Sequence, residues 1–191
     1  MFNMKSVFLR ALLALSLAIG VAPAFAGPTY KVSFDTSTYS GPGFLDLQFL
    51  SGGFAGLSFA NVSNLSGDFG TAVLDNATGD LASGFRIAND SGFNAVYLQL
   101  QLGGMFSFDV SFDGADLSDG ITFSASLLDE NEINLFGDLP LVIIDLSPGV
   151  PPVLGPSPGA EVAVVPEPSD ALLMLTGLAL LGFTLRRRSL R

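Results

Sequence analysis

The chain has 191 residues, with eight Lys and Arg against eighteen Asp and Glu, a formal net charge of −10, and no His or Cys. Without cysteine it has no disulfides, thiolate metal ligands or thiol catalysis, and without histidine it lacks the commonest general base and metal ligand. The acidity disfavours nucleic acid as a partner, because a phosphate backbone needs a cationic surface.

Residues 1–26 have the pattern of a secretory signal peptide. Two basic residues precede an apolar run of eleven residues, and Ala24 and Ala26 then place small side chains before Gly27. Since signal peptidase accepts small residues at these two positions, we expect it as a partner and Gly27 as the mature start. An N-terminal membrane anchor or a buried helix is disfavoured, because the run is short and a small-residue site follows it. The protein is therefore expected to leave the cytoplasm.

Residues 27–146 are expected to form one all-β domain. Apolar and polar residues alternate with a period of two, which is typical of strands buried on one face. Glycine-containing pairs separate these segments about every ten residues, as turns do in an antiparallel β-sandwich or a jelly-roll-like fold. The apolar positions of the five clearest segments are Tyr30-Val32-Phe34, Leu45-Leu47-Phe49, Val96-Leu98-Leu100-Leu102, Phe106-Phe108-Val110-Phe112 and Ile121-Phe123-Ala125-Leu127.

The glycine pair Gly103-Gly104 predicts a specific hairpin. A three-residue loop over 102–104 would pair Leu100 with Phe106, keep the apolar residues of both strands on one face, and leave Gln99 and Gln101 on the other. Gly104 would then adopt the left-handed conformation of a bulged turn.

The composition and charge of this domain indicate a solvated surface around an apolar core. Residues 27–165 carry two basic and sixteen acidic residues, a formal charge of −14, which is typical of a soluble secreted protein. Thirteen Phe lie between Phe34 and Phe136, and we expect most of them in the core, because Phe has no polar group. Tyr39 and Tyr97 remain as aromatic residues able to contact a ligand.

The segment 147–164 is expected to be a linker. Five prolines between residues 147 and 159 cannot donate a regular ladder of hydrogen bonds, which favours an extended tether that holds the domain away from the membrane. Residues 161–165 either add one short edge strand or stay extended.

The last part of the chain, 165–191, combines a rigid acidic turn, an apolar run and a cationic end. We expect a transmembrane helix at about 169–185, although the fifteen apolar residues span only about 22 Å of a hydrocarbon core of about 30 Å. The arginines favour a cytoplasmic C-terminus. The residues of the turn and the cationic end are Val165, Pro166, Glu167, Pro168, Arg186, Arg187 and Arg188.

This tail resembles the PEP-CTERM sorting domain of exported proteins of Gram-negative bacteria. The resemblance covers about 25 residues and implies that Pro166, Glu167 and Pro168 are recognised by an exosortase, an integral-membrane cysteine protease that removes the tail. Asp170 departs from the family pattern, which is often apolar there. The resemblance implies a precursor anchored in the inner membrane by a single span and then a protein at the cell surface or in the extracellular matrix, with exopolysaccharide as a further partner. It does not reach the activity of residues 27–146.

Two acidic clusters are candidate sites. Asp113, Asp116 and Asp119 could supply oxygen ligands to calcium, but their spacing is not that of an EF-hand, and a plain acidic turn is the favoured interpretation. The second cluster, around Asp129 and Glu130, could serve a carboxylate-based hydrolase, but a solvated loop is favoured.

The sequence thus predicts a non-enzymatic surface or matrix protein, associated with exopolysaccharide or biofilm, that needs no cofactor. A carbohydrate- or calcium-dependent binding module is the first alternative. A secreted carboxylate-based hydrolase is the second, and the lack of His and Cys argues against it.

Overall fold

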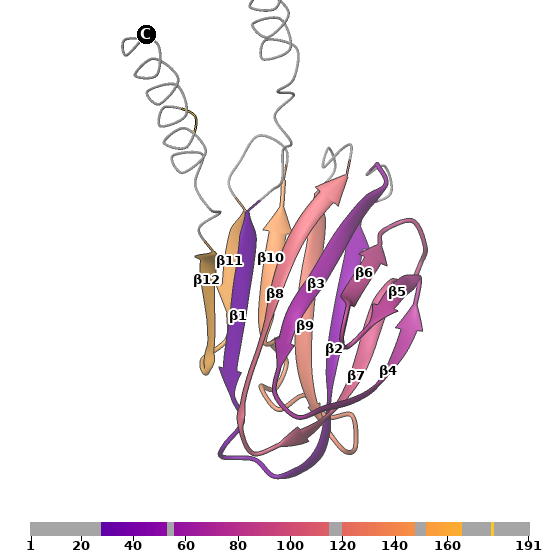
Figure 1. Ribbon diagram of the computed structural model, residues 1–191. Coiled ribbons are helices and arrows are strands. Elements are labelled where there is room, and N and C mark those ends of the chain that lie inside the picture. Colours follow the sequence, from indigo (N-terminus) through magenta and orange to yellow (C-terminus); the bar gives the residue numbers. More distant parts are fainter. Residues whose placement is uncertain (1–27, 53–55, 115–119, 148–151, 166–176, 178–191) are drawn as a thin grey trace, which may run out of the picture.

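Two antiparallel sheets of six strands each pack face to face, as the expected β-sandwich requires (Figure 1). The computed structural model describes residues 28–52, 56–114, 120–147 and 152–165, together with Gly177. One sheet has the order β12-β1-β8-β3-β6-β5 and the other the order β11-β10-β9-β2-β7-β4. The strands are β1 (Thr29–Asp35), β2 (Gly41–Ser51), β3 (Ser58–Ser66), β4 (Phe69–Asp75), β5 (Ala77–Asp80), β6 (Gly84–Ala88), β7 (Ala95–Leu102), β8 (Met105–Gly114), β9 (Ile121–Asp129), β10 (Val142–Leu146), β11 (Val153–Pro156) and β12 (Ala160–Val165).

The predicted alternation places the core correctly. All apolar positions of the five segments named above are buried, whereas Gln99 and Gln101 between them are exposed. Aromatic pairs join the sheets, because Phe108 and Phe112 of β8 both contact Phe123 of β9 edge to face, with ring centroids 6.3 and 5.9 Å apart. The expectation that Phe fills the core is confirmed for seven residues: Phe34, Phe49, Phe85, Phe106, Phe108, Phe112 and Phe123.

The predicted hairpin at Gly103 and Gly104 is wrong. Strands β7 and β8 lie in different sheets, and Leu100 pairs with Gly43 and Phe69, not with Phe106. Both strands do turn their apolar residues toward the core, but they do so from opposite sides of it. The left-handed residue is Gly103, with φ of 119°, and not Gly104.

Hydrogen bonds of the buried Thr36 hydroxyl stabilise this crossover. The Thr36 hydroxyl accepts hydrogen bonds from the backbone N–H groups of Gly103 and Gly104, at 3.0 and 3.1 Å, and donates to the Gly104 carbonyl at 2.9 Å. The β1–β2 turn and the β7–β8 connection are thereby joined at the same end of the sandwich.

The segment predicted to be a linker, 147–164, instead contributes strands to both sheets. Strand β11 pairs with β10, and β12 pairs with β1 over six residue pairs, so that the alternative of an edge strand at 161–165 is confirmed. Pro156 is tolerated in β11 because β11 is an edge strand, where one side of the backbone needs no partner.

Several expectations fall outside the described residues. These are the signal peptide with Ala24, Ala26 and Gly27, and the tail beyond Val165 apart from Gly177. In the part of the chain that the structure describes, no helix has the length and apolar character needed to cross a membrane.

Candidate functional site

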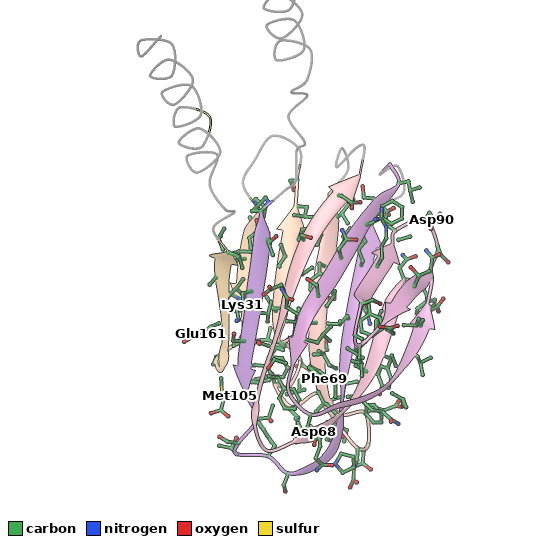
Figure 2. All side chains as sticks on the ribbon, in the orientation of Figure 1. Lys31, Asp68, Phe69, Asp90, Met105 and Glu161 are labelled. Atoms are coloured by element: carbon green, nitrogen blue, oxygen red, sulfur yellow. The ribbon has the colours of Figure 1, made fainter. Side chains whose placement is uncertain are left out.

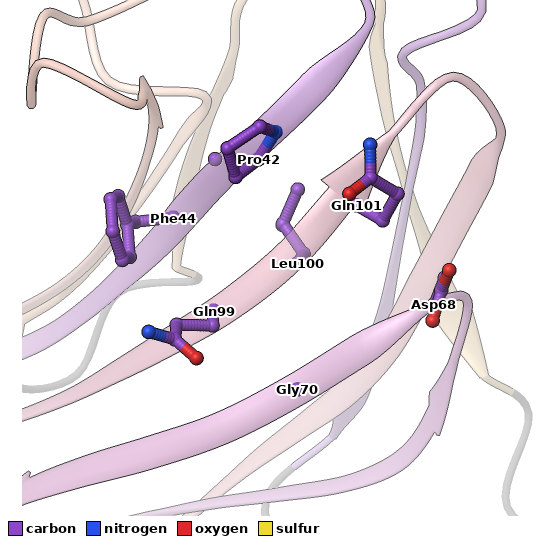
Figure 3. A pocket seen from close by; sticks show the side chains of 8 residues that line it. Pro42, Phe44, Asp68, Gly70, Gln99, Leu100 and Gln101 are labelled. Atoms are coloured by element: carbon purple, nitrogen blue, oxygen red, sulfur yellow. The ribbon is translucent and has the colours of Figure 1, made fainter.

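A groove crosses the outer face of the sheet that contains β2, β7 and β4. We call it the β2–β7 groove; it has a volume of about 270 Å³ and is lined by Pro42, Gly43, Phe44, Asp68, Gly70, Gln99, Leu100 and Gln101 (Figure 3). Figure 2 shows Asp68 at the lower end of the sandwich, where β2 begins and β7 ends.

Strand register explains why the polar and aromatic side chains share this face. Phe44 lies directly opposite Gln99, and Pro42 lies opposite Gln101, in the β2–β7 ladder. Because side chains two residues apart point to the same side of a strand, all four face outward, away from the buried Leu45 and Leu100.

Phe44 is held in place by an aromatic neighbour. Its ring stacks on Tyr97, the diagonal cross-strand residue, with centroids 4.7 Å apart and planes 21° apart. Both residues are half-buried, so the pair fixes the Phe44 ring while leaving part of it at the surface.

Strand β4 borders the groove on the side of β7 away from β2. The β4–β7 register shifts between Phe69 and Ala72, and this irregularity places Gly70 beside Gln99. A Cβ atom at Gly70 would lie 3.3 Å from the Gln99 Cβ, so the missing side chain leaves the space above Gln99 open. Irregularities of this kind are common at edges of sheets and beside binding sites.

Hydrogen-bonding capacity remains in the groove. The Thr71 hydroxyl donates to Gln99 Oε1 at 2.6 Å, which orients that amide. Within the described ranges, the Gln99 amide nitrogen, the Gln101 amide and the Asp68 carboxylate make no side-chain hydrogen bond. Exposed amides and a carboxylate beside an aromatic ring can bind a polar ligand that also has an apolar face.

Beyond Phe44, the same face carries a partly buried acidic patch. Burial raises the pKa of the Asp46 carboxyl, and a hydrogen bond from the Gln48 amide partly offsets this. The Tyr97 hydroxyl is buried and has no hydrogen-bond partner among the described residues. Burial, followed by the negative charges of Glu132 and Asp46, raises the pKa of Tyr97 to about 12.

The calcium candidates are only partly described. Asp113 forms an exposed ion pair with Arg86, 3.1 Å from Nη2 to Oδ1, and its other oxygen accepts from the Asn61 amide at 3.0 Å. Asp116 and Asp119 lie outside the described residues. Among the residues that are described, no three acidic side chains gather closely enough to hold a metal ion, and calcium binding stays a prediction.

The second acidic cluster supports a turn. The Asp129 carboxylate accepts hydrogen bonds from the backbone N–H groups of Ile133 and Asn131, at 2.9 and 2.8 Å, and these bonds lower its pKa. Asp129 and Glu130 line a depression of about 240 Å³ that adjoins the β2–β7 groove at Pro42. Asp129 is thus engaged in backbone contacts rather than poised as an acid.

Of the two tyrosines singled out from the sequence, Tyr39 packs against the core and Tyr97 supports Phe44. Phe44, Asp68 and Gly70 were missed. A local signal exists for Phe44, because it is an aromatic residue on the polar face of a strand, out of phase with Leu45. No local signal exists for Asp68 and Gly70, which reach the groove only through the strand order.

Comparison of the chain with protein-family models, with curated proteins and with solved structures found no match.

Proposed function

We propose that the chain is an exported, non-enzymatic protein of the cell surface or extracellular matrix, whose C-terminal sorting segment is removed by an exosortase-type protease. One observation supports it best. Thr29, two residues after the expected mature start, pairs with Val165, the first residue of the sorting segment. The two targeting segments therefore join the domain on neighbouring strands at the same end of one sheet.

This pairing fits a protein delivered to and held at one membrane. Both segments would reach the bilayer from one side, as export by a signal peptide and retention by a single C-terminal span require. Only residues 166–170 separate β12 from the apolar run, and five residues reach at most about 18 Å. The domain of the precursor would stand close to the membrane, in place of the long tether expected from the prolines.

The domain supports a structural or binding role rather than catalysis. The Asp113 carboxylate forms an ion pair with Arg86, and the Asp129 carboxylate accepts hydrogen bonds from backbone N–H groups.

We also infer a jelly-roll-like arrangement, because most connections cross between the sheets, as in β1–β2, β2–β3, β7–β8 and β8–β9.

The test is the intact mass and location of the protein in producing cells with and without the sorting protease. We expect a mature form that begins at Gly27, ends near Pro166–Pro168 and lies outside the inner membrane. Glu167→Ala with Pro168→Ala should leave the longer, membrane-bound form, whereas the matched control Pro158→Ala should mature normally. An unchanged mass and location with and without the protease would reject the proposal.

A further inference from the structure

We propose that the β2–β7 groove binds a neutral polysaccharide. The inference rests on the proposed function, since an exported protein meets such polymers at the surface or in the matrix, and it identifies which part of the domain contacts them. A volume of about 270 Å³ lies just below the range of roughly 300–1,000 Å³ typical of small-molecule pockets, which suits one or two sugar units of a longer chain.

The lining chemistry matches a sugar ring. A pyranose presents hydroxyl groups around its edge and C–H groups on its faces. The Gln99 and Gln101 amides and the Asp68 carboxylate offer donors and acceptors to hydroxyls, and the Phe44 ring, fixed by Tyr97, offers an electron-rich face to C–H groups (Figure 3).

The shape permits a chain to pass. The groove runs across three adjacent strands, and the open space at Gly70 continues past Gln99 toward Phe44 and Pro42. Beyond Pro42 the second depression, lined by Tyr39 and Asp129 among others, extends the same surface. A polymer can therefore contact the groove with an internal unit and need not present an end.

Charge decides between neutral and anionic polymers. Residues 27–165 contain two basic side chains, Lys31 and Arg86, and both lie in the sheet opposite the groove, on β1 and β6. Asp68 lines the groove itself, and Asp46 lies on the same face. A polyuronate or sulfated chain would meet negative potential with no compensating cation, so a neutral polymer is favoured.

The position in the fold keeps the groove accessible. Strand β1 runs from Thr29, at the end that bears the targeting segments, to Asp35 at the opposite end. Gln101 and Pro42 lie at that opposite end, where Thr36 joins the β1–β2 turn to the β7–β8 crossover. The groove would therefore face away from the membrane even in the anchored precursor.

Affinity electrophoresis of the protein in the form that producing cells accumulate, extracted in mild detergent where that form is membrane-bound, tests this inference. The gels contain a soluble glucan, mannan or galactan, or polygalacturonate as the anionic comparison. We expect retardation by at least one neutral polymer and none by polygalacturonate. Gln99→Ala with Gln101→Ala should weaken binding at least about tenfold through the loss of two hydrogen-bonding groups.

Two further variants separate binding from folding. Phe44→Leu removes the aromatic face, and Gly70→Leu fills the space beside Gln99; both should weaken binding. The matched controls are Phe59→Leu on the outer face of the other sheet and Thr78→Ala on β5, and they should bind as the unmodified chain does. Melting temperatures of all variants identify any loss of binding caused by unfolding.

The inference is overturned if no neutral polymer retards the chain, if polygalacturonate binds at least as well, or if folded groove variants bind like the controls. These outcomes are independent of the processing experiment. Normal maturation without polysaccharide binding would reject the groove alone, whereas binding without maturation would reject the proposed function alone.

Discussion

The hydroxyl of Thr36 should be worth several kcal/mol, because it joins the turn after β1 to the crossover between the sheets. Thr36 is fully buried, and its hydroxyl makes three hydrogen bonds, two from N–H groups and one to a carbonyl. Thr36→Val keeps the shape but removes all three. At about 1 kcal/mol each, the loss is about 3 kcal/mol, which lowers the melting temperature by about 6–12 °C in a chain of this size.

Two variants give this experiment its controls. Thr36→Ser keeps the hydroxyl and loses one buried methyl group, and should cost about 1 kcal/mol. Thr38→Val changes an exposed residue of the same turn and should stay within about 0.5 kcal/mol of the unmodified protein.

Urea unfolding followed by far-ultraviolet circular dichroism measures these differences. The hairpin expected from the sequence gives Thr36 no special role. If Thr36→Val were as mild as Thr38→Val, the stabilising role of the Thr36 hydroxyl at the crossover would be refuted.

The edge strand β12, the ion pair between Asp113 and Arg86, and the ionisation of Tyr97 each give a further prediction. A chain ending after Val165 should keep the melting temperature of the full domain, whereas one ending after Gly159 should be markedly less stable, because β1 loses its six-residue partner; equal melting curves would contradict the place of β12 in the sheet. Asp113→Asn should cost less than about 1 kcal/mol in urea unfolding, since the ion pair with Arg86 is about half exposed; a larger loss would indicate a further role such as calcium binding. The stability of the unmodified protein should fall between pH 10 and about 12, because the unfolded chain loses the Tyr97 proton first, and Tyr97→Phe should reduce this fall; identical pH profiles would contradict the raised pKa.

The sequence predicted which side chains would be buried because that information is local. Leu45, Leu47 and Phe49 alternate with polar residues, and a strand turns such residues to opposite faces whatever its partner is. The same reasoning placed Gln99 and Gln101 at the surface. It also predicts export and sorting from patterns at the two ends, which depend on order along the chain and not on the fold.

The partner of each strand could not be predicted from the same pattern. Leu100 and Phe106 face a common core whether their strands are neighbours in one sheet or lie in opposite sheets, so alternation alone fits both arrangements. Proline content likewise excludes a central strand but leaves an edge strand open, which is the place that Pro156 occupies in β11.

Sequence alone thus determined which residues of the five clearest strands are buried and which face outward, and it predicts the roles of the two ends. Only tertiary structure brought Asp68 and Gly70 beside Gln99, and Thr29 beside Val165. The physical reason is that the side of the sheet to which a side chain points depends on a two-residue period within one strand. Pairing depends on contacts between segments up to 136 residues apart, whose free energies are decided by the packing of the whole sandwich.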